Sequence, residues 1–150
     1  MKIILVRHGE AGKNLGLMMP GEKENLTAKG VKQAVELAAE LAGTKIGAIY
    51  CSPTLRCQQT LDEILRIRDD NMPIHLTSIV GPKLKKEKYT QLQHRIEIFL
   101  DDLKNDHEKD ETVLVISHLR PIEMMTWLVN KEKTRLENGM KTELDLRFTK

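Results

Sequence analysis

The sequence has few aromatic residues and no apolar run approaching the roughly 20 residues that a membrane-spanning helix needs. Aromatic residues make up 3% of the chain, which disfavours the base-stacking surfaces that bind single-stranded nucleic acid. The apolar run at the N-terminus is too short for a signal peptide and leads directly into charged residues. These absences predict a cytoplasmic protein with no nucleic-acid partner and no membrane partner.

Cysteine is also scarce, and the net charge is small. Cys51 and Cys57 are too few for a disulfide framework and have no metal-ligand spacing, so we interpret them as small buried groups in a reducing compartment and expect no metal site. The 24 basic and 22 acidic residues leave a net charge of +2, which gives no overall attraction to polyanions. A length of 150 residues predicts a single domain spanning 1–150, and we expect a monomer or a weak dimer.

Apolar strands alternate with amphipathic helices along the chain. The predicted strands are Met1–Leu5, Lys45–Tyr50, Ile74–Val80, Val113–Ile116 and Thr142–Thr149. Helices are expected from an N-cap at Thr27 to Gly43, from a cap at Ser52 through Ile67, over Tyr89–Leu103 and after Pro121. This order predicts an α/β fold of three layers, α/β/α, with a mostly parallel sheet and one antiparallel edge strand.

Charged and imidazole side chains follow the ends of three apolar segments. Arg7 and His8 come directly after the first strand, Arg56 falls in the first turn of the helix after the second, and His118 follows the fourth. Right-handed crossovers place the carboxyl ends of parallel strands at one edge of the sheet. The sequence therefore predicts a cationic pocket at that edge, with an imidazole that can act as a nucleophile.

The motifs that carry these residues resemble the histidine phosphatase superfamily. Its hallmark Arg-His-Gly corresponds to Arg7-His8-Gly9, its second arginine to Arg56 and its second histidine to His118. The helix start Leu26–Gly30 also matches. The resemblance implies a phosphoglycerate mutase-like fold and a phosphatase that forms a phosphohistidine intermediate on His8, with no cofactor and no metal.

Within that superfamily the chain is most similar to the short phosphohistidine phosphatases of the SixA type. The chain length, the sequence Arg7–Ala11 and the sequence Ser117-His118-Leu119 carry this similarity. The mutase branch normally supplies an acidic proton donor after the third strand, and Ile79–Lys83 contains none. An ester needs such a donor, whereas phosphohistidine can take its proton from solvent, so we expect a protein phosphohistidine as substrate.

The resemblance also implies roles for the individual residues. His8 is the expected nucleophile, and the expected phosphate ligands are Arg7, Asn14, Arg56 and His118. Glu10 has two interpretations: it orients an arginine or the substrate, or it replaces the missing proton donor. The other polar stretch nearby, Lys83–Lys88, is interpreted as a solvated helix start, and Trp127 as a residue that packs in the core or against a loop.

Three other functions remain open at this point. The chain could be a phosphatase for small phosphomonoesters, such as sugar or nucleotide-type phosphates, with Glu10 or Glu87 as the proton donor. It could be a phosphate-binding regulatory module without catalysis, although binding alone does not require a nucleophile. It could also be a doubly wound domain with an unrelated ligand. A loss of phosphoester turnover in Glu10→Gln or Glu87→Gln would favour the first of these.

Overall fold

The computed structural model describes residues 1–12 and 24–147. The strands are β1 (Lys2–Arg7), β2 (Ala48–Cys51), β3 (Ile74–Leu76), β4 (Thr112–Ser117) and β5 (Lys141–Asp145). The helices are α1 (Ala28–Leu41), α2 (Leu55–Arg66), α3 (Tyr89–Asp106) and α4 (Leu119–Asn130), with a short 3₁₀ helix, η3 (Ser78–Val80). No helix in these residues is both long and apolar enough to cross a membrane.

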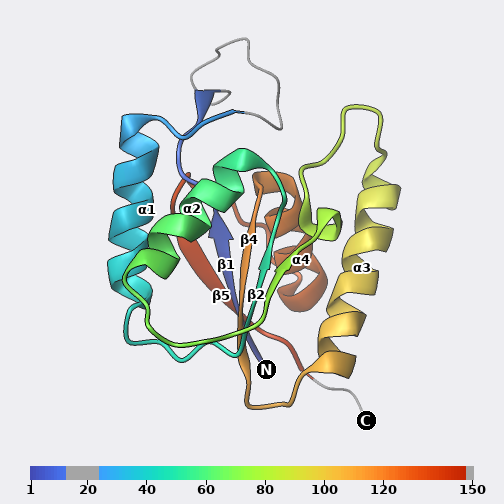
Figure 1. The fold of residues 1–150 in the computed structure, drawn as a ribbon. Helices are drawn as coiled ribbons and strands as arrows, with labels where there is room; N and C mark the ends of the chain where they lie inside the picture. The colour runs from blue at the N-terminus through green and yellow to red at the C-terminus, as the bar shows by residue number, and fades with distance from the viewer. Residues whose placement is uncertain (13–23, 148–150) are drawn as a thin grey trace.

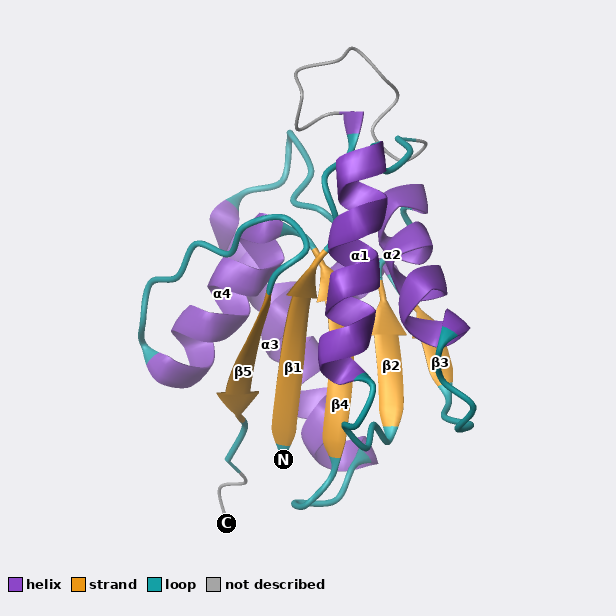
Figure 2. Cartoon of the chain, turned by 90° about the vertical axis from the view of Figure 1, so that its left-hand side faces the viewer, coloured by secondary structure: helices purple, strands orange, loops and turns teal. Residues whose placement is uncertain are grey.

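The sheet has the strand order β3-β2-β4-β1-β5. Its strands lie between the helices in Figure 1, and Figure 2 shows all five in this order from right to left. Strand β1 pairs in parallel with β4, and β2 pairs in parallel with both β3 and β4. Strand β5 runs antiparallel to β1 at the edge of the sheet. The predicted fold class, a mostly parallel sheet with one antiparallel edge strand, is confirmed. The register aligns Arg7 with Ser117 and Cys51 with Ile116, so β1, β2 and β4 end at the same edge.

Alternate side chains of the central strands face two separate apolar cores. Ile3 and Leu5 of β1 belong to the core beneath α3 and α4, whereas Ile4 and Val6 belong to the core beneath α1 and α2. Helices α1 and α2 therefore cover one face of the sheet and α3 and α4 cover the other (Figure 2). This double coverage explains the unbroken apolar run in β1, because both faces of the strand are buried.

The predicted third strand is shorter than expected. Strand β3 ends at Leu76, and the hydroxyl of Thr77 accepts a hydrogen bond from the amide of Ile79 to begin η3. The side chains of β3 are all exposed, which accounts for the weak alternation of its sequence. The chain then turns at Gly81-Pro82 and reaches α3 only at Tyr89, so Lys83–Lys88 precedes the helix instead of starting it.

Helix α2 also begins later than expected. Thr54 has extended backbone angles, with φ −63° and ψ 147°, and the first helical residue is Leu55. The hydroxyl of Ser52, expected to cap this helix, lies 2.8 Å from the imidazole of His118. By contrast, the predicted cap of α1 is confirmed, because Thr27 Oγ1 accepts a hydrogen bond from the amide of Gly30 at 3.0 Å.

One arginine holds the connection between β3 and α3 in place. Arg95 of α3 donates hydrogen bonds to the carbonyl oxygens of Ile79, Gly81 and Pro82 and pairs through two nitrogens with the carboxylate of Glu87. These hydrogen bonds from Arg95 lower the pKa of Glu87. The guanidinium thus fixes a segment that contains no regular strand or long helix.

A close backbone contact joins the end of β1 to the start of α1. A Cβ atom on Gly9 would lie 2.5 Å from the carbonyl oxygen of Gly30, and one on Gly30 would lie 2.0 Å from the carbonyl oxygen of Glu10. Both distances are shorter than real Cβ contacts, so only glycine fits at either position.

We predict that Gly30→Ala destabilises the protein by about 1–3 kcal/mol, although alanine normally stabilises a helix, because the new Cβ atom overpacks the contact with Glu10. Urea unfolding measures the change. Gly43→Ala is the matched control, since nothing lies within 4 Å of a Cβ atom there, and it should be neutral or slightly stabilising. Equal effects of the two substitutions on the free energy of unfolding would contradict the prediction that the contact at Gly30 excludes a side chain.

We predict that Glu87→Gln lowers the free energy of unfolding by about 1–2 kcal/mol at pH 7. Because the folded-state pKa of Glu87 is lowered, its stabilisation is present above the unfolded pKa and is lost as the pH falls through the folded pKa. The difference between the two proteins in urea unfolding should therefore shrink in acid. Glu63→Gln, which removes a more exposed pair with Arg66, should change little.

Candidate active site

The structure brings four of the predicted site residues together at the carboxyl edge of the sheet. Arg7, His8, Arg56 and His118 line one cavity of about 200 Å³. Arg7 ends β1, His8 follows it, Arg56 lies in the first turn of α2, and His118 precedes α4. Both histidines and Arg56 are buried. The convergence predicted from the strand order is present.

The backbone determines which nitrogen of His8 can act. Nδ1 of His8 lies 2.7 Å from the carbonyl oxygen of Gly9. A carbonyl can only accept, so Nδ1 carries the proton in the neutral ring and Nε2 carries the lone pair. Nε2 faces Nε of Arg56 at 3.4 Å. The nitrogen that carries the lone pair is thus directed toward a fixed positive charge.

The second histidine contacts the first and is oriented by Ser52. The two imidazole rings are 5.1 Å apart between centroids and inclined at 61°. Nδ1 of His118 lies 3.3 Å from Nη2 of Arg56, and Nε2 lies 2.8 Å from Oγ of Ser52. Because a guanidinium only donates, Nδ1 accepts and Nε2 donates to the hydroxyl in the neutral ring. Sequence reasoning had assigned Ser52 a different role.

Cys57 touches the same imidazole but is chemically inert. Its Sγ lies 3.5 Å from Nε2 of His118 and is fully buried. Burial raises the pKa of the Cys57 thiol to about 11, so the sulfur stays protonated near neutral pH. Cys51 is buried as well, in agreement with the expectation of two small buried groups.

Arg7 carries a buried donor without an acceptor. Its Nη1 donates to the carbonyl oxygen of Leu136 at 2.9 Å. Its Nε, by contrast, is the one buried side-chain nitrogen or oxygen in the described part of the chain that has no hydrogen-bond partner. Burial also lowers the pKa of Arg7. An anion bound in the cavity would give this guanidinium both an acceptor and a counter-charge.

Residues that sequence reasoning did not identify fix the backbone of the motif. Asn138 Nδ2 donates to the carbonyl oxygen of His8 at 3.3 Å, and the amide of Gly139 lies 3.0 Å from the carbonyl oxygens of both Arg7 and His8. On the other side, Thr60 Oγ1 accepts from the amide of Gly9 at 3.1 Å. Thr60 lies one helical turn after Arg56, and this spacing was its only signal in the sequence.

Two further predicted residues do not line the cavity as it is described. The carboxylate of Glu10 accepts a hydrogen bond from Thr27 Oγ1 at 2.9 Å and lies 3.9 Å from Nζ of Lys29, so it supports the start of α1. Asn14 lies outside the described residues. Its predicted role as a phosphate ligand remains a prediction.

Two cations that sequence reasoning did not place in the site complete the cavity wall. Lys83 and Arg120 line it, together with Pro82 and Leu119, and none of the described lining residues is a carboxylate. Within residues 1–12 and 24–147, no group of three His, Cys, Asp or Glu side chains could hold a metal ion. The cavity is therefore suited to a compact anion such as a phosphoryl group.

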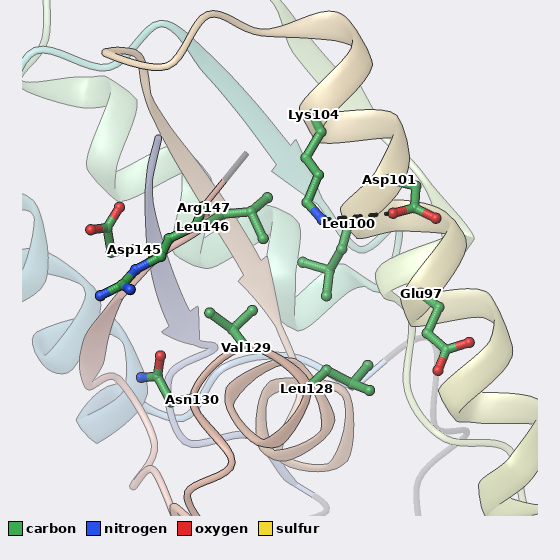
Figure 3. Close-up of a pocket in the computed structure, with 10 residues that line it drawn as sticks. All are labelled: Glu97, Leu100, Asp101, Lys104, Leu128, Val129, Asn130, Asp145, Leu146 and Arg147. Atoms are coloured by element: carbon green, nitrogen blue, oxygen red, sulfur yellow. Dashed lines mark ion pairs between the residues drawn. The ribbon is translucent and has the colours of Figure 1, made fainter. Parts of the chain in front are cut away.

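A larger hollow lies at the other end of the parallel strands, away from His8 and His118. It measures about 500 Å³ and is lined by residues of α3 and α4 and by the segment from Asp145 to Arg147 (Figure 3). Asp145 pairs with Lys2 at the start of β1, which places this hollow at the amino ends of the parallel strands. Its charged lining residues include Lys104, 3.9 Å from Asp101, and it contains no imidazole or thiol among the described lining residues.

Known proteins of the same fold include two solved structures of moderate similarity. The protein histidine phosphatase SixA complexed with tungstate aligns with a TM-score of 0.71 and 18% identity over 97% of both chains. A phosphoglycerate mutase from Bacillus anthracis aligns with a TM-score of 0.83 and 18% identity over 99% of this chain and 90% of that one. At these identities the likeness shows the fold alone.

Sequence comparison adds curated relatives and a family. The adenosylcobalamin/alpha-ribazole phosphatase of Escherichia coli is 28% identical over 70% of this chain and 50% of its own length. The chain spans between 26% and 59% of the length of four curated relatives that it matches. The family model of the histidine phosphatase superfamily (branch 1) matches residues 3–80. This range is more than half of the chain and includes Arg7, His8 and Arg56. The chain therefore belongs to the histidine phosphatase superfamily.

Proposed function

We propose that the protein is a phosphatase that transfers a phosphoryl group from its substrate to Nε2 of His8 and then to water. The observation that carries this proposal is the orientation of His8: Nδ1 is held by the carbonyl of Gly9, and Nε2 faces the guanidinium of Arg56 in an otherwise cationic cavity. A nucleophilic imidazole requires the first feature, because only a neutral nitrogen with a lone pair can attack phosphorus, and the second supplies positive charge for a phosphoryl group bound beside Nε2.

The reaction proceeds in two displacements. In the first, Nε2 of His8 forms a bond to phosphorus while the leaving group departs with its bonding electrons. In the second, water attacks phosphorus, the N–P bond breaks, and inorganic phosphate leaves with His8 neutral again. The transition states spread negative charge over the equatorial oxygens, and the cations of Arg7 and Arg56 lie where they can stabilise it. His118, fixed by Ser52, adds a third contact.

The favoured substrate is a phosphohistidine in a protein. None of the described cavity-lining residues is a carboxylate, and the carboxylates of Glu10 and Glu87 are both engaged elsewhere. An alkoxide leaving group would need one of them as an acid. Phosphohistidine does not, because its second ring nitrogen can take a proton from solvent, as an unmodified imidazole does near pH ~6.5, and the leaving group is then neutral imidazole.

Small phosphomonoesters are the second candidate substrate. The curated relative from Escherichia coli that aligns with 70% of this chain is named as a phosphatase of alpha-ribazole compounds. For such a substrate, the carboxyl of Glu10 would have to exchange its contact with Thr27 for one with the leaving oxygen.

We predict that His8→Ala abolishes turnover, by about 10³-fold or more, because it removes the proposed nucleophile and the other imidazole that lines the cavity, His118, directs its Nε2 at Ser52. Two substrates are assayed separately: a phosphocarrier protein phosphorylated on histidine, and p-nitrophenyl phosphate. Both assays contain a metal chelator. His94→Ala, at an exposed position of α3, is the matched control and should retain full activity.

The outcomes separate the candidates. Turnover of phosphohistidine in preference to the ester, lost in His8→Ala, supports the proposal. Turnover of the ester alone would be consistent with His8 as the nucleophile, but it would favour a small phosphomonoester as the substrate. Inactivity of the natural protein on both would reject the proposed function and favour a non-catalytic phosphate-binding role.

We predict that Glu10→Gln leaves the pH dependence of phosphohistidine turnover unchanged, because the carboxylate contacts Thr27 and Lys29 and no proton transfer passes through it. Stopped assays from pH 5 to pH 9 measure this. A selective loss of sugar-phosphate turnover in the same variant, by about 10²-fold, would identify Glu10 as a general acid and favour the ester, because an alkoxide leaving group needs a proton whereas p-nitrophenolate leaves without one.

A further inference from the structure

An apolar groove lies beside the cavity that contains His8 and Arg56, on the surface formed by α3, α4 and the segment after α4. It measures about 430 Å³, and its lining residues are Tyr89, Gln93, Arg120, Glu123, Met124, Trp127, Lys133 and Thr134. We call this the α3–α4 groove. Trp127 was expected to pack in the core or against a loop, but it is 43% exposed, and Tyr89 is 55% exposed. Large aromatic side chains exposed in one groove mark a binding surface.

The groove borders the cavity. Arg120 lines both hollows. Lys83 lines the cavity, and its Nζ lies 4.9 Å from the centre of the Tyr89 ring at the border of the groove. A cavity of about 200 Å³ holds a phosphoryl group and little of the molecule that carries it. The remainder of a larger substrate therefore has to lie outside the cavity, and the α3–α4 groove is a surface that borders it.

Positive charge surrounds the apolar floor of the groove. Arg120 and Lys133 line the groove, and the ammonium groups of Lys83 and Lys131 lie over the rings of Tyr89 and Trp127 at 4.9 and 4.7 Å. The one carboxylate among the described lining residues, Glu123, is paired with Nη1 of Arg120 at 2.9 Å. The net charge around the groove is thus positive, and an occupant should be negatively charged.

We propose that the α3–α4 groove binds the polypeptide that carries the phosphorylated residue, with an apolar side chain of that polypeptide on Trp127 and Tyr89 and acidic side chains against the surrounding cations. This inference rests on the proposed function. The composition favours a polypeptide over a small molecule, because tryptophan, tyrosine, methionine and arginine are the residues enriched at protein interfaces. The complementary charge favours an acidic one.

The probes are free phosphohistidine and three short phosphohistidine peptides, whose flanking residues are glutamate and leucine, glutamate and alanine, or lysine and leucine. Trp127→Ala should lower kcat/KM for the glutamate–leucine peptide by about 10-fold or more, and should leave free phosphohistidine within about twofold. Ile67→Ala, which removes an exposed apolar side chain from the end of α2, is the matched control and should change neither.

Charge is tested by a second pair of variants. Lys133→Glu should lower kcat/KM for the glutamate–leucine peptide and raise it for the lysine–leucine peptide, and added salt should reduce both effects. Lys109→Glu places the same charge change beside the start of β1, at the other edge of the sheet, and should leave the ranking of the peptides unchanged.

Trp127 also reports occupancy without turnover, because it is the only tryptophan in the chain. The unphosphorylated glutamate–leucine peptide should shift its fluorescence in a saturable manner, and the lysine–leucine peptide should not. A shift without turnover of any phosphohistidine would reject the proposed function and keep the docking site. No shift, or an equal loss of turnover for peptide and free phosphohistidine in Trp127→Ala, would overturn the docking site.

Discussion

The hydrogen bond from Nδ1 of His8 to the carbonyl of Gly9 determines what the rest of the site can do. It fixes the proton on one ring nitrogen and leaves the other to face Arg56. The carbonyl keeps its direction because Thr60 holds the amide of Gly9 and because Gly9 packs on the backbone of Gly30. A side chain on either glycine would move this carbonyl. The chemistry of an imidazole therefore depends on a contact between two backbones.

Positively charged side chains extend from His8 toward the surface of the protein. Arg56 contacts both His8 and His118, and Arg7 retains a buried donor for an incoming anion. Arg120 lies at the border between the cavity and the α3–α4 groove. Positive charge is thus continuous from the proposed nucleophile to the proposed docking surface. In the proposed reaction the same kind of interaction would guide the partner, hold the phosphoryl group and stabilise the transition state.

The sequence was sufficient for features that depend on order along the chain. Apolar strands and helices in alternation predicted the sheet, and the positions of His8 and His118 after strands predicted their meeting. The contact between Ser52 and His118 could not be predicted, because it joins residues 66 apart without any periodic pattern. The exposure of Trp127 could not be predicted either, because a tryptophan among methionines on a helix is typical of a core-facing segment. Only the packing of α3 against α4 decides which side of the helix faces water.

The pairing of β1 has a consequence for how the protein is made. Strand β1 begins at residue 2, but its two neighbours in the sheet begin at residues 112 and 141. During synthesis, this largely apolar strand emerges before either of its neighbours and remains unpaired until nearly all of the described chain has been made. Such non-local pairing folds slowly and exposes an aggregation-prone segment in the meantime. Because His8 follows that strand and His118 follows its partner, the two imidazoles meet only once β4 has closed the sheet.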